Sequence, residues 1–117
     1  MLSFDAPIFH GLESYLDVAV TRQSLIASNM ANVDTPGYKT QDLDFAQALD
    51  QAEAGLDPAA AGHQVSGLLE RPDGNNVNLD RESMLMAQTQ LQYSTGVALM
   101  RTEFHRLNMA INGGSNA

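Results

Sequence analysis

The chain contains no cysteine and no tryptophan, and its 6 Lys and Arg residues are outnumbered by 14 Asp and Glu residues. Without cysteine there is no disulfide framework, no thiolate zinc site and no cysteine nucleophile. The formal net charge of −8 argues against nucleic-acid binding, because neutralising phosphates requires a basic surface. We therefore expect no nucleic-acid partner.

Long apolar runs are also missing. The first seven residues show no basic segment followed by an apolar core, so the sequence has no visible cleavable secretory signal. No stretch approaches the about 20 apolar residues that span a bilayer as a helix. If the protein leaves the cytoplasm, we expect a route that does not cleave a signal peptide.

The acidity is concentrated in the middle of the chain. Residues 1–39 sum to −2, residues 40–80 to −7 and residues 81–117 to +1, which gives the total of −8. A chain of 117 residues forms at most one small domain with a modest core. We interpret the acidic middle as a solvated, flexible segment between two nearly neutral ends.

Both ends of the chain show a helical heptad pattern. The first stretch starts near Asp5-Ala6-Pro7, where proline suits a first helical turn. Its apolar positions recur at alternating spacings of four and three residues, with one glutamine among them: Leu12, Leu16, Ala19, Gln23, Ile26, Met30 and Val33. The second stretch starts at a cap at Asn78 or Asp80, is ended by Gly113-Gly114, and repeats the pattern: Met86, Gln90, Tyr93, Val97, Met100, Phe104, Leu107 and Ile111. Such a 3.5-residue period is typical of a coiled-coil seam.

Signals between the two heptad patterns are weaker. Asp44 followed three residues later by Gln47 indicates a capped short helix that contains Phe45 and Leu49. Residues 54–62 have no sustained period and predict a linker, residues 65–69 an extended stretch, and residues 71–76 a turn. The fold class that follows is all-α: two long terminal helices packed as an antiparallel coiled-coil-like hairpin, a short helix after the turn, and an irregular middle segment. We divide the chain into residues 1–39, 40–78 and 79–117.

No constellation of residues indicates catalysis. His10, His63 and His105 form no metal-binding pair, no serine lies in a nucleophile elbow, and no glycine loop suits a phosphate. Asp42 and Asp44 lie near a predicted helix start, where the helix dipole accounts for them. We expect no enzyme activity, no metal, no cofactor and no small-molecule substrate.

The most informative stretch is Ala27-Ser28-Asn29-Met30-Ala31-Asn32-Val33-Asp34-Thr35-Pro36-Gly37-Tyr38-Lys39. Pro36 ends the first helix, and Thr35-Pro36-Gly37-Tyr38 predicts a tight turn with Gly37 at positive φ. Asn29 and Asn32 are three residues apart and share a face of the helix. From physics alone this is a helix C-terminus followed by a turn.

The whole thirteen-residue string, at the end of an N-terminal helix, resembles the signature of the bacterial flagellar axial proteins, which are the rod, hook and hook-associated subunits. Within this family the short middle, the segment 39–49 after the turn and the C-terminal helix resemble a subunit of the proximal rod. The resemblance covers residues 1–52 and 73–112. It implies a structural subunit of the periplasmic rod of the flagellar basal body, exported through the flagellar type III apparatus without signal cleavage.

The resemblance also implies partners and site residues. The partners are copies of the chain itself, other rod proteins, the junction protein FliE and the flagellar export gate. The residues that shape the bend at the subunit contact are Asn29, Asn32, Asp34, Thr35, Pro36, Gly37 and Tyr38. Two alternatives stay open: a proximal rod subunit of the FlgC type, against which the C-terminal helix argues, and a soluble helical adaptor or export chaperone. A chaperone would fold as a compact dimer alone, whereas a rod subunit needs neighbours to cover its apolar stripes.

Overall fold

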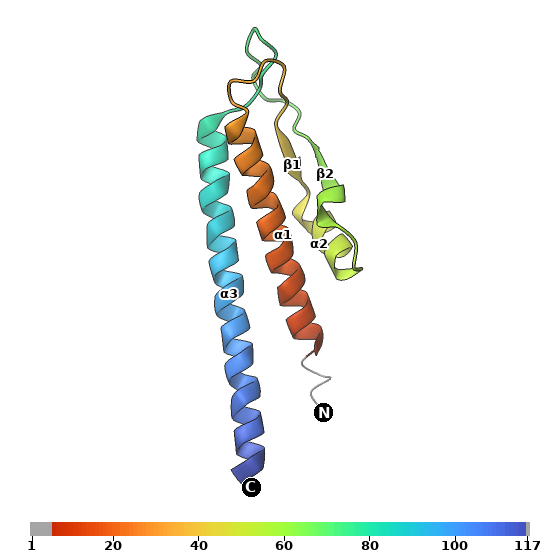
Figure 1. Cartoon of the computed structure of the whole chain (residues 1–117), viewed down its shortest axis with the longest axis vertical. Helices are drawn as coiled ribbons and strands as arrows, with labels where there is room; N and C mark the ends of the chain where they lie inside the picture. The colour runs from red at the N-terminus through yellow and green to blue at the C-terminus, as the bar shows by residue number, and fades with distance from the viewer. Residues whose placement is uncertain (1–5, 117) are drawn as a thin grey trace.

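The structure, a computed structural model, describes residues 6–116 and is strongly elongated, with extents of 71 × 25 × 18 Å (Figure 1). Its elements follow the order α1 (Ala6–Ala31), β1 (Gln41–Leu43), α2 (Phe45–Glu53), the 3₁₀-helix η2 (Pro58–Ala61), β2 (Gly62–Gln64) and α3 (Leu79–Asn116). α1 begins at Ala6 with Pro7 in its first turn, as the sequence predicts. Asp5, also predicted to lie at this start, is outside the described residues.

The two terminal helices, α1 and α3, lie side by side and run in opposite directions (Figure 1). Near the start of α1, the rings of Phe9 and Phe104 lie 4.8 Å apart between centroids. At the end of α1, Asn29 donates a hydrogen bond to Glu82 in the first turn of α3. Since residues early in α1 meet residues late in α3, the packing is antiparallel. The prediction that the terminal helices pack together is confirmed.

The other side of α1 carries a small layer that the sequence did not fully predict. β1 and β2 form a two-stranded antiparallel sheet, with Gln41 opposite Gln64 and Leu43 opposite Gly62. Together with α2 and η2 this layer encloses a small core of Val18, Leu43, Ala48 and Ala61. The all-α prediction therefore missed a sheet of two three-residue strands.

Most of the predicted helix ends are confirmed. The Asp44 side chain accepts a hydrogen bond from the backbone N–H of Gln47 at 3.1 Å and so caps α2. Asn78 caps α3 by accepting from the N–H of Arg81 at 3.1 Å. The predicted end of the last helix is wrong, because α3 continues through Gly113-Gly114 to Asn116.

The prediction of an unstructured linker at residues 54–62 is also incomplete. Asp57 caps η2 by accepting from the N–H of Ala59 at 2.9 Å, with Pro58 in the first turn. Across residues 6–116, none of the helices combines the length and apolar character that crossing a bilayer requires.

Candidate assembly site: the turn, the polar network beneath it and the exposed helix stripe

The predicted turn is present at the end of α1. The backbone N–H of Tyr38 donates to the carbonyl of Thr35 at 3.2 Å, and Gly37 has φ of 75°. These are the closing hydrogen bond and the positive φ of the glycine that the sequence pattern Thr-Pro-Gly-Tyr demands. The turn sends the chain from α1 into β1, back along the same helix (Figure 1).

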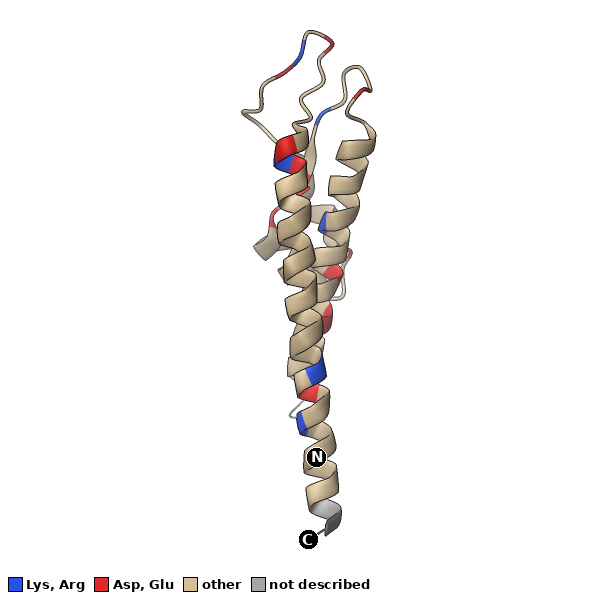
Figure 2. Cartoon of the chain, turned by 90° about the vertical axis from the view of Figure 1, so that its left-hand side faces the viewer, with Lys and Arg blue, Asp and Glu red and all other residues tan. Residues whose placement is uncertain are grey.

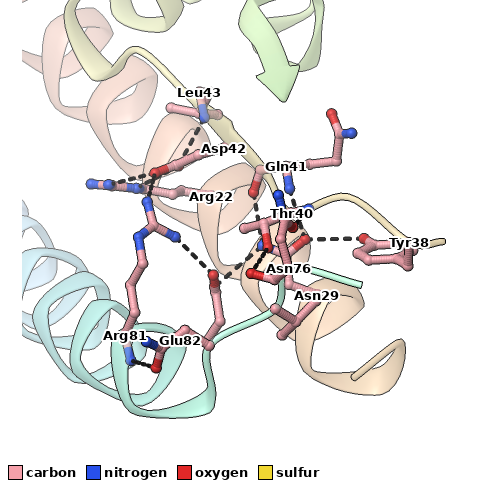
Figure 3. A network of polar contacts seen from close by, with 12 residues as sticks. Arg22, Asn29, Tyr38, Thr40, Gln41, Asp42, Leu43, Asn76, Arg81 and Glu82 are labelled. Carbon is pink, nitrogen blue, oxygen red and sulfur yellow. Dashed lines mark hydrogen bonds and ion pairs between the residues drawn. The ribbon is translucent and has the colours of Figure 1, made fainter. Parts of the chain in front are cut away.

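Asn29 fixes that return, although it is completely buried on the last turn of α1. Its Nδ2 donates to the carbonyl of Gln41 at 2.7 Å, and its Oδ1 accepts from the N–H of Gln41 at 3.0 Å and from the hydroxyl of Tyr38 at 3.0 Å (Figure 3). Nδ2 also donates to Oε2 of the buried Glu82 at 3.2 Å. One amide thus joins α1, the turn, β1 and α3, with all its hydrogen-bonding capacity used.

A second buried asparagine holds the turn from the loop that precedes α3. Asn75 donates through Nδ2 to the carbonyl of Asn32 at 2.9 Å and to that of Thr35 at 2.8 Å. Its Oδ1 accepts from the N–H of Val77 at 2.8 Å. Asn75 therefore gives a second hydrogen bond to two carbonyls of the turn, which also accept from the backbone N–H groups of Thr35 and Tyr38.

Neighbouring backbone and side-chain contacts also join the loop to the turn. The N–H of Gly37 donates to the carbonyl of Asp73 at 2.9 Å, and Oδ1 of Asn76 accepts from the N–H of Thr40 at 2.7 Å. A Cβ added to Gly74 would lie 3.4 Å from Cα of Gly37. The loop and the turn form one structural unit.

Asp42 on β1 is the centre of an ionic cluster between the two long helices (Figure 3). Arg22 of α1 holds it with two hydrogen bonds of 3.0 and 3.1 Å, Arg81 of α3 lies 3.4 Å away, and the N–H of Leu43 donates to it at 2.8 Å. Burial raises the pKa of Asp42, but the hydrogen bonds from Arg22 and Leu43 and the charges of the two arginines outweigh it and lower the pKa below 3.8. The earlier explanation of Asp42 by a helix dipole is wrong, because its partners are guanidinium groups.

Charged residues are distributed unevenly along the molecule (Figure 2). Four of the 6 Lys and Arg residues form ion pairs near the turn, namely Arg22, Lys39, Arg71 and Arg81. Residues 83–100 of α3 contain no charged residue at all. The turn end is held by ionic contacts, whereas the shaft of α3 presents neutral side chains.

The turn residues named from the sequence divide into two groups. Asn29, Asn32, Thr35, Gly37 and Tyr38 take part in the hydrogen bonds above, whereas Asp34 and Pro36 are exposed. Sequence reasoning missed the roles of six further residues in the network, which are Arg22, Asp42, Asn75, Asn76, Arg81 and Glu82. Arg22 could have indicated this network from the sequence, because it is an arginine within a largely apolar helix of a chain with few basic residues.

The predicted seam residues of the first helix are buried or half-buried: Leu12, Leu16, Ala19, Gln23, Ile26, Met30 and Val33. The predicted extension of the helix to Val33 is wrong, because α1 ends at Ala31 and Val33 lies in the turn. On α3 the face against α1 is a different stripe, containing Glu82, Leu85, Thr89 and Gly96. The predicted seam is centred roughly 60° further around the helix at 3.6 residues per turn. Met86, Val97, Met100 and Leu107 of that seam are half-buried, and Gln90 is exposed. Tyr93 is 40%, Phe104 56% and Ile111 47% exposed. Three of the seven apolar seam residues of α3 are therefore left exposed in a single chain.

The paired terminal helices, the Thr-Pro-Gly-Tyr turn and the open apolar stripe form the elongated helical frame that the resemblance to the flagellar axial proteins implies. Residues 18–39, which contain the end of α1 and the turn, match the family model described as "Flagella basal body rod protein".

Relatives match most of the chain. It is 30% identical to the flagellar basal body rod protein FlgB of Bacillus subtilis, over 97% of this chain and 99% of that protein. It is 32% identical to FlgB of Aeromonas hydrophila, over 96% of this chain and 97% of that protein, and 35% identical to FlgB of Cereibacter sphaeroides, over 80% and 84%. The chain belongs to the FlgB family of flagellar basal body rod proteins.

Proposed function

We propose that this chain, a structural and non-enzymatic subunit of the flagellar basal body rod, enters the proximal rod by packing its terminal helices against neighbouring subunits. The observation that supports this most directly is the open stripe of α3, where Tyr93, Phe104 and Ile111 remain 40–56% exposed. Large apolar side chains aligned on one helix face mark an interaction surface. In the rod, neighbours cover this stripe with coiled-coil-like packing.

The neutral shaft of α3 supports the same function. Charges buried at a tightly packed interface must be desolvated and paired, which costs free energy. Residues 83–100 avoid this cost, because they offer only neutral and apolar side chains. The ionic contacts are placed instead at the turn end, where they hold the shape of the subunit.

We extend the proposal to location and partners. The subunit lies in the periplasmic part of the basal body, contacts other rod proteins, the junction protein FliE and the export gate, and travels through the flagellar export apparatus without signal cleavage. The FlgB names of the relatives support the rod assignment. Intact mass of the subunit recovered from isolated basal bodies tests the export proposal, since cleavage would shorten its N-terminus.

The assembly proposal is tested by placing a charge on the open stripe. Ile111→Glu in a strain that lacks its own copy of the gene should abolish swimming and remove the subunit from isolated basal bodies. The matched control is Leu69→Glu, which changes a leucine that is 93% exposed outside both long helices and should leave both readouts unchanged. Normal rods with Ile111→Glu would contradict assembly through this stripe.

A FlgC-type subunit is disfavoured because the relatives that this chain matches over nearly their full length are named FlgB. A soluble adaptor or chaperone is disfavoured by the open stripe, since such a protein would cover it within its own dimer. Sedimentation of the dilute protein distinguishes an adaptor from a rod subunit, because a tight dimer at all concentrations would favour the adaptor.

A further inference from the structure

A groove of about 530 Å³ runs along the first half of α1, between α2 and α3. Its floor is α1, Ala52 of α2 forms one wall, and Tyr93 of α3 forms the other. The floor residues used below are Glu13, Leu16, Asp17 and Val20. Val20 is 49% exposed and Tyr93 40% exposed, and His10 and Ser14 also line the groove. The groove is therefore an open surface that is partly apolar and partly polar.

Two carboxylates lie on the floor of this groove. Glu13 and Asp17 are one helical turn apart and exposed, and neither forms an ion pair with another residue of the range 6–116. Like charges four residues apart on a helix repel each other. The groove therefore favours an occupant that has both an apolar face and a positive charge.

The C-terminal half of α3 has both features. Arg101 is exposed and, alone among the Lys and Arg residues of the described chain, lacks an ion pair. On the same side of the helix, Phe104 is 56% and Ile111 47% exposed. In Figure 1 this end of α3 extends beyond the first turn of α1. Phe104 also contacts Phe9 of its own chain, but its exposed side and the end of α3 beyond it remain accessible to a neighbouring subunit.

We propose that the groove of one copy receives the C-terminal half of α3 from a second copy, with Arg101 of the second copy pairing with Glu13 and Asp17 of the first. The two surfaces lie at different places on one chain, so the contact is heterologous, and each copy can accept one neighbour and offer itself to another. Contacts of this kind generate rings or open helical arrays, and the open array is the form that suits a rod. The inference rests on the proposed rod function and names the contact that would build the rod.

Cross-linking tests the contact, because the chain has no cysteine of its own. One copy carries Asp17→Cys and the other carries Arg101→Cys, both in a strain that lacks the native gene. Basal bodies are isolated, treated with a bismaleimide cross-linker whose arm is as long as an arginine–carboxylate pair, since a disulfide is too short to join these positions, and analysed by gel electrophoresis. A covalent dimer of the two variants is expected, and since each copy has a single cysteine, it can form only between copies.

The matched control pairs Asp17→Cys with Gln88→Cys. Gln88 is exposed on α3 and lies about 140° around the helix from Arg101 at 3.6 residues per turn, so this pair should give no dimer. Intact basal bodies that yield no dimer of the Asp17 and Arg101 variants overturn the inference while leaving the rod function standing. A cross-link from Asp17→Cys to a different basal body protein also overturns it, because the occupant would then be another subunit.

Charge exchange provides a second measurement that needs no cysteine. Arg101→Glu should abolish swimming, because it places three carboxylates together, and adding Asp17→Arg in the same chain should restore it. Arg106→Glu, an equal charge change on a residue that pairs with Glu103, should leave swimming intact. If the strain with both substitutions swims no better than the strain with Arg101→Glu alone, the proposed ion pair is absent.

Discussion

Asn29 and Gln41 bond to each other in both directions: the Asn29 amide donates to the Gln41 carbonyl at 2.7 Å and accepts from the Gln41 N–H at 3.0 Å. The side chain thus pairs with a strand backbone as a neighbouring strand would. Because Asn29 is on α1, the pair fixes the position of β1 along the axis of that helix. The direction in which the chain leaves the turn depends on this one amide.

We predict that Asn29→Ala lowers the free energy of unfolding by about 3 kcal/mol, since it leaves buried backbone and side-chain groups without partners. Urea unfolding followed by circular dichroism measures the change. Asn32→Ala is the matched control, because the hydrogen bonds of the Asn32 side chain are exposed: Nδ2 donates to the carbonyl of Ser28 at 2.8 Å, and Oδ1 accepts from the hydroxyl of Thr35 at 3.0 Å. This control should cost less than about 1 kcal/mol. Equal losses in the two variants would show that the buried network adds nothing.

A second prediction concerns the pH dependence of stability through Asp42. Its pKa is lowered below 3.8 in the folded chain, so as pH falls the unfolded chain takes up the proton first and gains stability. The contribution of Asp42 is therefore present above pH 3.8 and is lost as the pH falls from there through the folded pKa. Asp42→Asn removes this titration without changing the other carboxyl groups.

Urea unfolding of both proteins at a series of pH values measures the effect. The stability difference between wild type and Asp42→Asn should be constant near neutral pH and should shrink below pH 3.8. A difference that stays constant down to the lowest pH would show that the cluster with Arg22 and Arg81 does not hold the carboxylate in its charged form.

Local chemistry explains which parts of this fold the sequence predicts. The caps at Asp44 and Asn78 and the turn at Gly37 depend on residues within three positions of one another, so their structure follows from short patterns. The polar network does not, because Asn29 meets Glu82 across 53 positions. Nothing in the neighbourhood of either residue identifies the other.

The heptad pattern of α3 shows a different limit of prediction from the sequence. Period and polarity predict that Tyr93, Phe104 and Ile111 form an apolar stripe, but they do not say which helix covers it. Within the chain the face against α1 includes Gly96 and Thr89, which hydropathy alone would not select. The small sheet escaped prediction because its strands are three residues long and too short to show a period.

Gly96 gives a prediction about the helix pair. A Cβ at this position would lie 2.7 Å from Cδ2 of Leu16 and 3.1 Å from Cδ1 of Tyr15, so Gly96→Ala must push α1 and α3 apart or displace both side chains. We expect a loss of about 1 kcal/mol or more, because overpacking outweighs the better helix propensity of alanine. Thermal unfolding measures it.

Gly11→Ala is the control for Gly96→Ala, since Gly11 also lies within a helix but has nothing within 4 Å of an added Cβ. There alanine should stabilise by up to about 1 kcal/mol. The two substitutions are chemically identical, so opposite signs would isolate the close approach of the helices at Gly96. Two stabilised variants would mean that the helices are further apart than the structure places them.

The last prediction concerns the turn itself. Gly37 has φ of 75°, and nothing lies within 4 Å of an added Cβ, so a substitution there acts through the backbone alone. Gly37→Val should cost about 1–2 kcal/mol, because a β-branched residue is strained at positive φ. Gly37→Asn should cost less, since asparagine tolerates that conformation.

Because both long helices are held by their own packing, Gly37→Val should leave the helix content measured by circular dichroism nearly unchanged. Relief of the strain would redirect the chain after Thr35 and weaken the bond from the Gly37 N–H to the carbonyl of Asp73, which ties the turn to the loop before α3. Swimming and the amount of subunit in isolated basal bodies should therefore fall more than helicity does, with Gly37→Asn between the valine variant and wild type. Full motility with Gly37→Val would show that rod assembly does not depend on the geometry of this turn.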